Sequence, residues 1–189
     1  MRAGVLFCPV CGAVQGPGSM DHFARLGLAV GFDVDVEALE RPYFALQRQL
    51  HPDRFAGKSP KEKALSQQQA TMLNEAYETL KDPLKRGVYL LELLGRGVDL
   101  TACGTINDPE LLMEQMEKRE ALSDATTPEQ VAKLAMENES EVIACQCHIS
   151  AAFNAGKLEE AGHLSIRLKY LVKLADEARS KKSRVARLS

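Results

Sequence analysis

The stretch QRQLHPDRFAG, residues 47–57, decides how the first half of this chain folds. It ends an amphipathic run, because apolar residues from Asp35 to Leu50 recur at alternating steps of three and four. That spacing predicts a helix with one apolar stripe facing a partner. The helix must end at Leu50, since the ring of Pro52 pushes the preceding residue out of the α region. His51, Pro52 and Asp53 are therefore expected to form a turn.

A second helix is predicted directly after this turn. Ser59-Pro60-Lys61-Glu62 combines an N-cap serine, a proline at the first helical position and a glutamate placed to close a capping box. We expect this helix to run to Lys81, where Asp82-Pro83 ends it and opens a short helix to Leu94. The result is a helical hairpin with the turn at its tip. Pro42 lies inside the first helix and predicts a kink or a late helix start near Glu40.

Composition and charge narrow the possible partners. The chain has 189 residues, 45% of them hydrophobic and 26% charged, with a net charge of -2. Such a balance supplies no global field to attract nucleic acid or an anionic membrane, and no run of about eighteen apolar residues could span a bilayer. We expect neither nucleic acid nor membrane as a partner. Five irregularly spaced cysteines favour a reducing compartment. The bacterial cytoplasm is expected, with the mitochondrial matrix as the alternative.

The second half predicts three further helices and no strand. Asp108-Pro109 begins the first, to about Leu122; Thr127-Pro128-Glu129-Gln130 begins the second, to Ala155; the third carries an apolar stripe from Ala161 to Ala178. The predicted fold is all-α, an N-terminal helical hairpin followed by a C-terminal three-helix bundle. The expected division is a cysteine-containing segment at 1–19, the hairpin domain at 20–95, a linker at 96–107 and the bundle at 108–189.

Three interpretations of the His51-Pro52-Asp53 turn compete. It could be a plain turn whose aspartate caps local amides, which is the commonest role for such a tripeptide. It could hold a general base and its orienting group, but no Ser-His-Asp arrangement or glycine-rich phosphate loop accompanies it. It could also be a contact element, since a proline-stiffened tip loses little entropy on binding. Arg41 and Arg48, seven residues apart, share one face of the preceding helix and could pair with acidic groups.

The surrounding sequence resembles the J-domain of DnaJ-type co-chaperones. The resemblance runs from Asp21 to about Leu94 and includes LQRQLHPDRF (46–55) and NEAYETLKDPLKRGVYLL (74–91). J-domains stimulate ATP hydrolysis by DnaK-type chaperones. The resemblance therefore implies that His51, Pro52 and Asp53 trigger a partner's ATPase and that Arg41 and Arg48 supply a basic face. It implies a co-chaperone and not an enzyme.

The second half is similar to HscB, the J-protein of iron-sulfur cluster assembly, through LLMEQMEKREAL (111–122), GVYLLELLG (87–95) and LKYLVKL (168–174). That family delivers the scaffold protein IscU to a dedicated ATPase, HscA. A J-protein with a different client is the alternative. The resemblance implies a scaffold-binding face of Leu112, Met113, Met116, Glu117, Glu120 and Tyr170.

Helical spacing alone does not decide whether this face is exposed or packed in the core. Leu112, Met113 and Met116 share one side of their helix, where methionines suit an adaptable surface, but a core stripe would read the same way. Tyr170 falls off the apolar stripe of its own helix. We therefore expect Tyr170 and Met113 to be exposed.

Cys8 and Cys11 form a CxxC pair followed by Gly12. Their spacing lets two thiolates reach one tetrahedral metal, but zinc normally takes four ligands. HscB-like proteins that resemble this segment carry two such pairs. A first pair lost from the recorded start, a metal shared by two chains, and free thiols all stay open. A degenerate metal knuckle is favoured over a redox or nucleic-acid role, and zinc at Cys8 and Cys11 is the one candidate cofactor. The following GAVQGPGS is expected to be a loop or linker and not a packed element.

Overall fold

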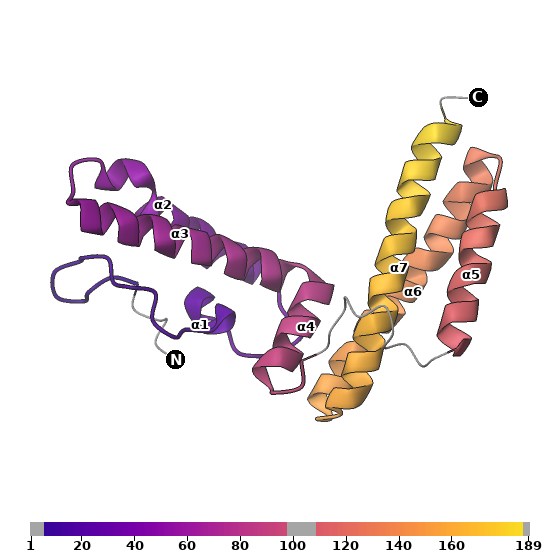
Figure 1. The fold of residues 1–189 in the computed structure, drawn as a ribbon, viewed down its shortest axis with the longest axis horizontal. Helices are drawn as coiled ribbons and strands as arrows, with labels where there is room; N and C mark the ends of the chain where they lie inside the picture. Colours follow the sequence, from indigo (N-terminus) through magenta and orange to yellow (C-terminus); the bar gives the residue numbers. More distant parts are fainter. Residues whose placement is uncertain (1–5, 98–108, 187–189) are drawn as a thin grey trace. The chain divides into compact units, whose positions relative to one another are not determined.

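The computed structural model describes residues 6–97 and 109–186 and divides into two compact units, Met1–Leu90 and Leu91–Ser189. Figure 1 follows the chain through its helices. The described residues form seven α-helices, one short 3-10 helix and a single isolated antiparallel bridge between Phe7 and Val14. The predicted all-α class is therefore confirmed. The predicted linker 96–107 lies outside the described residues, apart from Arg96 and Gly97.

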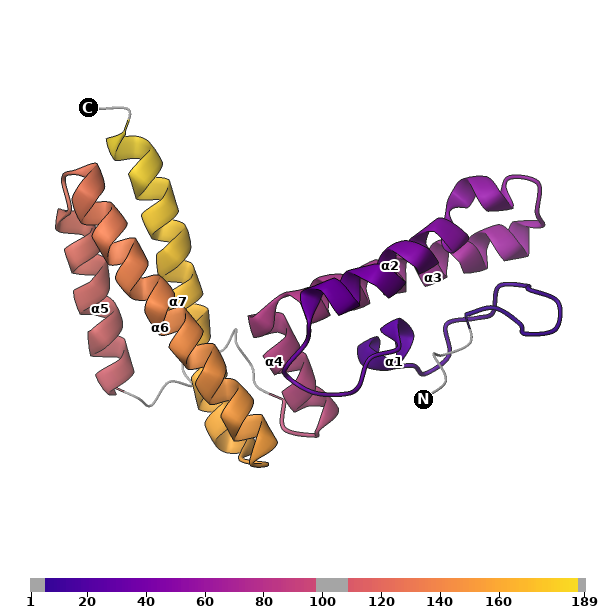
Figure 2. The same cartoon turned by 180° about the vertical axis from the view of Figure 1, so that it is seen from behind.

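The first unit is built on two long antiparallel helices, α2 (Val36–Leu50) and α3 (Pro60–Lys81), with the short helix α1 (His22–Leu26) beside them (Figures 1 and 2). Each helix begins at a side-chain cap, because unpaired amides in the first turn need acceptors. Asp21 accepts from Ala24 at the start of α1, and Ser59 forms the predicted reciprocal capping box with Glu62 at the start of α3.

The core of this hairpin is the apolar stripe that periodicity predicted. α2 buries Leu39, Tyr43 and Leu50, and the rings of Tyr43 and Tyr77 stack with their centroids 3.9 Å apart. Val36, the first apolar residue of the predicted stripe, is instead 41% exposed. On α3, Leu73, Ala76 and Leu80 are fully buried, whereas Leu65 and Met72 of the same apolar stripe are only half-buried.

Pro42 does not delay the start of α2. The helix begins at Val36, where Asp35 accepts a hydrogen bond from the amide of Glu37. Pro42 therefore lies inside the helix, where it lacks the N–H that would bond to Ala38. The cap at Asp35 and the complete burial of Leu39 stabilise the turn before the proline. The predicted late start near Glu40 is wrong.

The segment before α1 is more closely packed than predicted. Leu6 and Val14 are buried, and the side chain of Gln69 on α3 donates to the Gln15 carbonyl at 2.8 Å. The buried guanidinium of Arg25 donates to Gln69 Oε1 at 2.6 Å and to the Pro17 carbonyl at 3.4 Å. Buried polar groups need partners, and the irregular backbone supplies them. GAVQGPGS is thus a loop held against α1 and α3, and not a linker.

The short helix α4 (Pro83–Leu93) follows Asp82, whose side chain accepts from the amide of Lys85. It ends one residue before the predicted Leu94 and crosses the division between the units. Leu91, at the start of the second unit, is fully buried in a cluster with Ala152 and Ala161.

The second unit is the predicted three-helix bundle of α5 (Pro109–Asp124), α6 (Pro128–Asn154) and α7 (Leu158–Val185). Thr127 and Gln130 form the predicted capping box of α6. The predicted cap of α5, Asp108, lies outside the described residues. A core cluster joins the three helices through Leu122, Ala125, Val131, Leu174 and Ala178. No helix among the described residues is long and apolar enough to cross a membrane.

Candidate functional site

Contacts with buried groups hold the turn at the tip of the hairpin on both sides. We call His51, Pro52 and Asp53 the HPD corner. Before it, the buried hydroxyl of Ser66 donates to the carbonyl of Leu50 at 2.7 Å. After it, Pro52–Phe55 forms the 3-10 helix η1, whose last side chain, Phe55, is buried. His51 itself is extended, with φ of −57° and ψ of 133°, as the following proline requires.

The three side chains of the HPD corner remain exposed to solvent. The imidazole of His51 and the carboxylate of Asp53 are 56% and 90% exposed, and His51 Nδ1 lies 3.4 Å from Asp53 Oδ2. Nδ1 also accepts from the amide of Asp53 at 3.3 Å, so the histidine and not the aspartate caps η1. The hydrogen bond from the Asp53 amide orients the imidazole without burying it. The imidazole and the carboxylate both remain available to a partner.

The helix before the corner presents the basic face that the sequence predicted. Arg41 and Arg48 are both exposed on α2. Phe44 lies between them, three residues after the first and four before the second, and is 48% exposed. Arginine and aromatic side chains are enriched in protein interfaces, so Phe44 joins the candidate contact face. Sequence reasoning missed it, although the same spacing of three and four would have placed it there.

The candidate scaffold-binding residues of α5 lie on its outer side. Leu112, Met113 and Met116 are exposed, the two methionines by 66% and 72%, and Glu117 and Glu120 are exposed beside them. The residues that α5 buries are Leu111, Gln115 and Leu122. The core interpretation is thereby excluded for the methionines, and the predicted exposure of Met113 is confirmed. We call Leu112, Met113, Met116, Glu117 and Glu120 the α5 surface.

Tyr170 is half-buried, so the prediction that it is exposed is wrong. Its helix buries Leu168, Leu171 and Leu174, and Tyr170 lies at the edge of that stripe instead of outside it. The ammonium group of Lys169 is 5.9 Å from the centroid of its ring. A half-buried ring can still contribute an edge to a contact surface.

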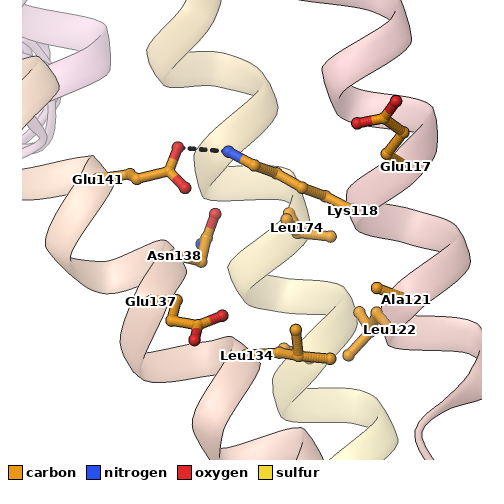
Figure 3. A pocket seen from close by; sticks show the side chains of 10 residues that line it. Glu117, Lys118, Ala121, Leu122, Leu134, Glu137, Asn138, Glu141 and Leu174 are labelled. Atoms are coloured by element: carbon orange, nitrogen blue, oxygen red, sulfur yellow. Dashed lines mark hydrogen bonds and ion pairs between the residues drawn. The ribbon is translucent and has the colours of Figure 1, made fainter.

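Ion pairs hold α5 against the rest of the bundle. Glu114 on α5 accepts from Lys118 at 2.6 Å and from Arg167 of α7 at 2.7 Å. Lys118 also bonds to Glu141 of α6, as Figure 3 shows. Partial burial would raise the pKa of Glu114, but the hydrogen bonds and charges of Lys118 and Arg167 outweigh it and lower the pKa. The network fixes which side of α5 faces outward.

Cys8 and Cys11 lie in a tight turn suited to two thiolates. The amide of Gly12, a residue with φ of 70°, donates to the Cys8 carbonyl at 2.9 Å. Hydrogen bonds from the amides of Cys11 and Val10 and from the Cys11 side chain lower the pKa of the Cys8 thiol. Among the described residues no third histidine, cysteine or acid joins them. The pair therefore supplies half of a zinc ligand set, and zinc stays a prediction. Cys103 lies outside the described residues.

Cys145, in contrast, has a packing role. It is buried in the bundle, its Sγ is 3.4 Å from the Leu164 carbonyl, and burial raises its pKa to about 11.

Comparison with known proteins covers both halves of the chain. The family model of the DnaJ domain matches residues 21–89, and that of the HSCB C-terminal oligomerisation domain matches residues 107–179. The co-chaperone protein HscB homolog of Paraburkholderia phymatum is 48% identical over 114 residues, which span 60% of this chain and 64% of that relative. The iron-sulfur cluster co-chaperone protein HscB of Mus musculus is 34% identical over 182 residues, 94% of this chain and 76% of the relative.

A solved structure agrees with these sequence matches. The crystal structure of human co-chaperone protein HscB superposes with a TM-score of 0.89 at 32% identity, covering 96% of this chain and 92% of the human chain. The HPD corner lies within the matched DnaJ domain and the α5 surface within the matched C-terminal domain. This chain therefore belongs to the HscB family of J-domain co-chaperones.

Proposed function

We propose that this chain stimulates the ATPase of a DnaK-type chaperone of the HscA kind and delivers an IscU-type iron-sulfur scaffold protein to it. The observation that carries the proposal is the geometry of the HPD corner. Its backbone is held by the buried groups Ser66 and Phe55, while its own side chains are exposed to solvent. Hydrolysis takes place in the partner, in keeping with the relatives' names as co-chaperones.

The corner is prepared for binding because little freedom remains to be lost. Pro52 fixes its own backbone, η1 fixes the next residues, and the hydrogen bond from the Asp53 amide orients the imidazole of His51. Preorganised groups bind at a smaller entropic cost. Arg41 and Arg48 add positive charge on the same hairpin, and Phe44 adds an apolar contact. Such a face fits an acidic surface with an apolar centre on the ATPase.

The α5 surface supports the second half of the proposal. Two exposed methionines are unbranched and polarisable, so they can adapt to the shape of a bound protein. Glu117 and Glu120 at their edge would attract basic groups of that protein. The name of the murine relative refers to iron-sulfur clusters, which favours a cluster scaffold as the client. A bacterial cytoplasm, or the mitochondrial matrix as the alternative, is the compartment that goes with this role.

Zinc at Cys8 and Cys11 remains a smaller proposal. The two thiols fit two of the four positions that zinc normally fills, so the remaining ligands must come from outside the described residues or from a second chain. Metal analysis of the purified protein tests it. One zinc per chain or one per two chains supports the assignment, and protein free of metal after purification without chelators contradicts it.

The function is tested by single-turnover ATP hydrolysis with a cognate DnaK-type chaperone, with and without this chain and with and without scaffold protein. We expect the chain to raise the hydrolysis rate alone and the scaffold to raise it further. A chain that leaves the rate unchanged would refute the co-chaperone role. The chain could also stimulate hydrolysis without binding the scaffold, so that adding scaffold leaves the rate unchanged. That result would indicate a J-protein with a different client.

A further inference from the structure

The bundle contains a half-open cavity of about 260 Å³ between α5 and α6, with α7 behind it. Figure 3 shows Leu122 and Leu134 close together at one end and Lys118 reaching Glu141 at the other. The volume exceeds the roughly 150 Å³ in which an apolar cavity binds benzene, and it is below the usual range for drug-sized ligands. It suits one large side chain. The apolar part of its wall consists of Ala121, Leu122, Leu134, Leu174 and Ala178.

One polar atom in this wall, the side-chain oxygen of Asn138, has no hydrogen-bond partner within the residues that the structure describes. Asn138 is 3% exposed, and its Nδ2 donates to the carbonyl of Leu171 at 2.9 Å. This bond fixes the orientation of the amide, because only the nitrogen can donate to a carbonyl. The buried Oδ1 then has no hydrogen-bond partner among the described residues. An unpaired buried acceptor is costly and favours a ligand that brings an N–H or O–H donor.

The rim of the cavity is acidic and meets the α5 surface. Glu117 and Glu137 lie at the rim from α5 and α6. Glu117 belongs to the α5 surface as well and has no ion pair in the described part of the chain, while Glu137 has only the exposed Lys133 at 3.9 Å. A protein segment with an apolar ring next to a basic residue would complement both the wall and the rim.

We propose that this cavity is an anchor pocket for one aromatic side chain of the bound scaffold protein, a ring whose N–H or O–H donates to Oδ1 of Asn138. This inference rests on the proposed function and extends it from the outer side of α5 to the groove between α5 and α6. The ring fills the apolar space, and a neighbouring basic residue of the scaffold pairs with Glu117 or Glu137. The exposed methionines of the α5 surface contact the scaffold next to the cavity.

The test blocks the cavity and measures scaffold binding. Ala121 is exposed at the mouth, so Ala121→Leu fills the opening without disturbing the core. Ala151→Leu is the matched control, because Ala151 is exposed on α6 away from the cavity. We expect Ala121→Leu to weaken scaffold affinity at least tenfold, as removal of a central anchor does, and Ala151→Leu to leave it unchanged.

The outcomes separate the pocket from the proposed function. If Ala121→Leu binds scaffold normally while Met113→Ala with Met116→Ala binds it weakly, the anchor pocket is refuted and the function stands. If neither variant weakens binding, the anchor pocket and the α5 assignment are both refuted, whereas a wild-type chain that binds no scaffold at all would refute the scaffold-binding function itself. Equal weakening by Ala121→Leu and Ala151→Leu would mean a general disturbance of the bundle and would also refute the pocket.

Small rings test the role of Asn138 directly. The chain contains no tryptophan, so the fluorescence of added indole has no indole background. We expect indole to bind between about twofold and tenfold more tightly than 1-methylindole, which lacks the N–H donor. We also expect indole to compete with the scaffold. Equal affinity of the two compounds, or indole binding that leaves scaffold affinity unchanged, would overturn the assignment.

Discussion

The HPD corner and the α5 surface are both exposed, but they are prepared for binding in opposite ways. The corner is short and polar, and its backbone is held by a proline, a 3-10 helix and the buried hydroxyl of Ser66. The α5 surface is apolar at its centre, and its methionines have several rotatable bonds. In the corner the backbone is fixed and a few groups are oriented. On α5 the helix is fixed by ion pairs and the side chains are free to adapt.

This difference fits two kinds of partner. A switch in an ATPase needs the same few groups presented in the same way at every encounter, which favours a stiff corner. A client that must be bound and then released needs a surface that can adjust, which favours methionine. Substitutions at the corner should therefore abolish stimulation of the ATPase completely, whereas substitutions on the α5 surface should lower scaffold affinity in steps.

The largest effect is expected from His51→Gln. The imidazole is exposed and contributes no core contact, so stability should fall by at most about 1 kcal/mol, through the lost cap of η1. Stimulation of the partner ATPase should fall to the unstimulated rate, while scaffold binding stays intact. Single-turnover hydrolysis and thermal unfolding measure the two quantities. His163→Gln, at an exposed histidine on α7, is the matched control and should behave as wild type. Normal stimulation by His51→Gln would remove the corner from the account.

A graded effect is expected on the α5 surface. Met113→Ala combined with Met116→Ala removes two exposed apolar side chains and should weaken scaffold affinity about tenfold, or roughly 1.4 kcal/mol. Stimulation measured without scaffold should not change. Met136→Ala, at a methionine of similar exposure on α6, serves as the control for loss of a surface methionine. Undiminished scaffold binding by the double variant would remove the α5 assignment.

The basic face of α2 should contribute several-fold and in a salt-dependent manner. Arg48→Ala removes one exposed charge beside the corner and should lower the apparent affinity for the chaperone about two- to fivefold at low ionic strength. The difference from wild type should shrink as salt is added, since screening weakens exposed charge pairs. Lys133→Ala, at an exposed lysine on α6, controls for net charge. A salt-independent response would argue against Arg41 and Arg48 as contacts.

The smallest effect is expected from the hydrogen bond that holds the backbone before the corner. Ser66→Ala removes the buried hydrogen bond to the Leu50 carbonyl and should cost about 1–2 kcal/mol of stability. If stiffness matters, stimulation should also fall about two- to threefold at a temperature where the protein is fully folded. Denaturant unfolding and the hydrolysis assay measure these two effects. Ser140→Ala is the control, because Ser140 is exposed and its hydroxyl donates only to the carbonyl of Met136 in the same helix. Unchanged stimulation despite the lost stability would indicate that the corner does not need this support.

Local rules predicted the elements because their signals lie within a few residues of one another. The capping boxes at Ser59 and Thr127 and the proline after His51 fix helix ends without help from the rest of the chain. The late helix start predicted from Pro42 was wrong, because burial of Leu39 and the cap at Asp35 offset the cost of a proline inside the helix. Partners distant in sequence were beyond such rules. The bond of Gln69 to Gln15, which holds the N-terminal loop, spans 54 residues.

The candidate sites were only partly predictable for the same reason. The HPD corner could be placed because a helix end and a hairpin tip are local features. The exposure of Met113 was predicted correctly, but periodicity alone could not separate it from core packing, because the side of α5 that is buried depends on contacts with α6 and α7. Tyr170 lies at an edge whose position depends on how three helices meet. The cavity beside Asn138 has no local signal, because its walls come from three helices.

The central claim is that one chain must carry both the HPD corner and the α5 surface, so that the client is presented to the ATPase. It is tested by mixing the His51→Gln chain with the Met113→Ala, Met116→Ala chain and measuring scaffold-enhanced single-turnover hydrolysis by the chaperone. We predict that, at a scaffold concentration well below the dissociation constant of the double variant, the mixture shows only the stimulation seen without scaffold. A mixture that restores the full scaffold-enhanced rate of the wild-type chain would contradict the claim.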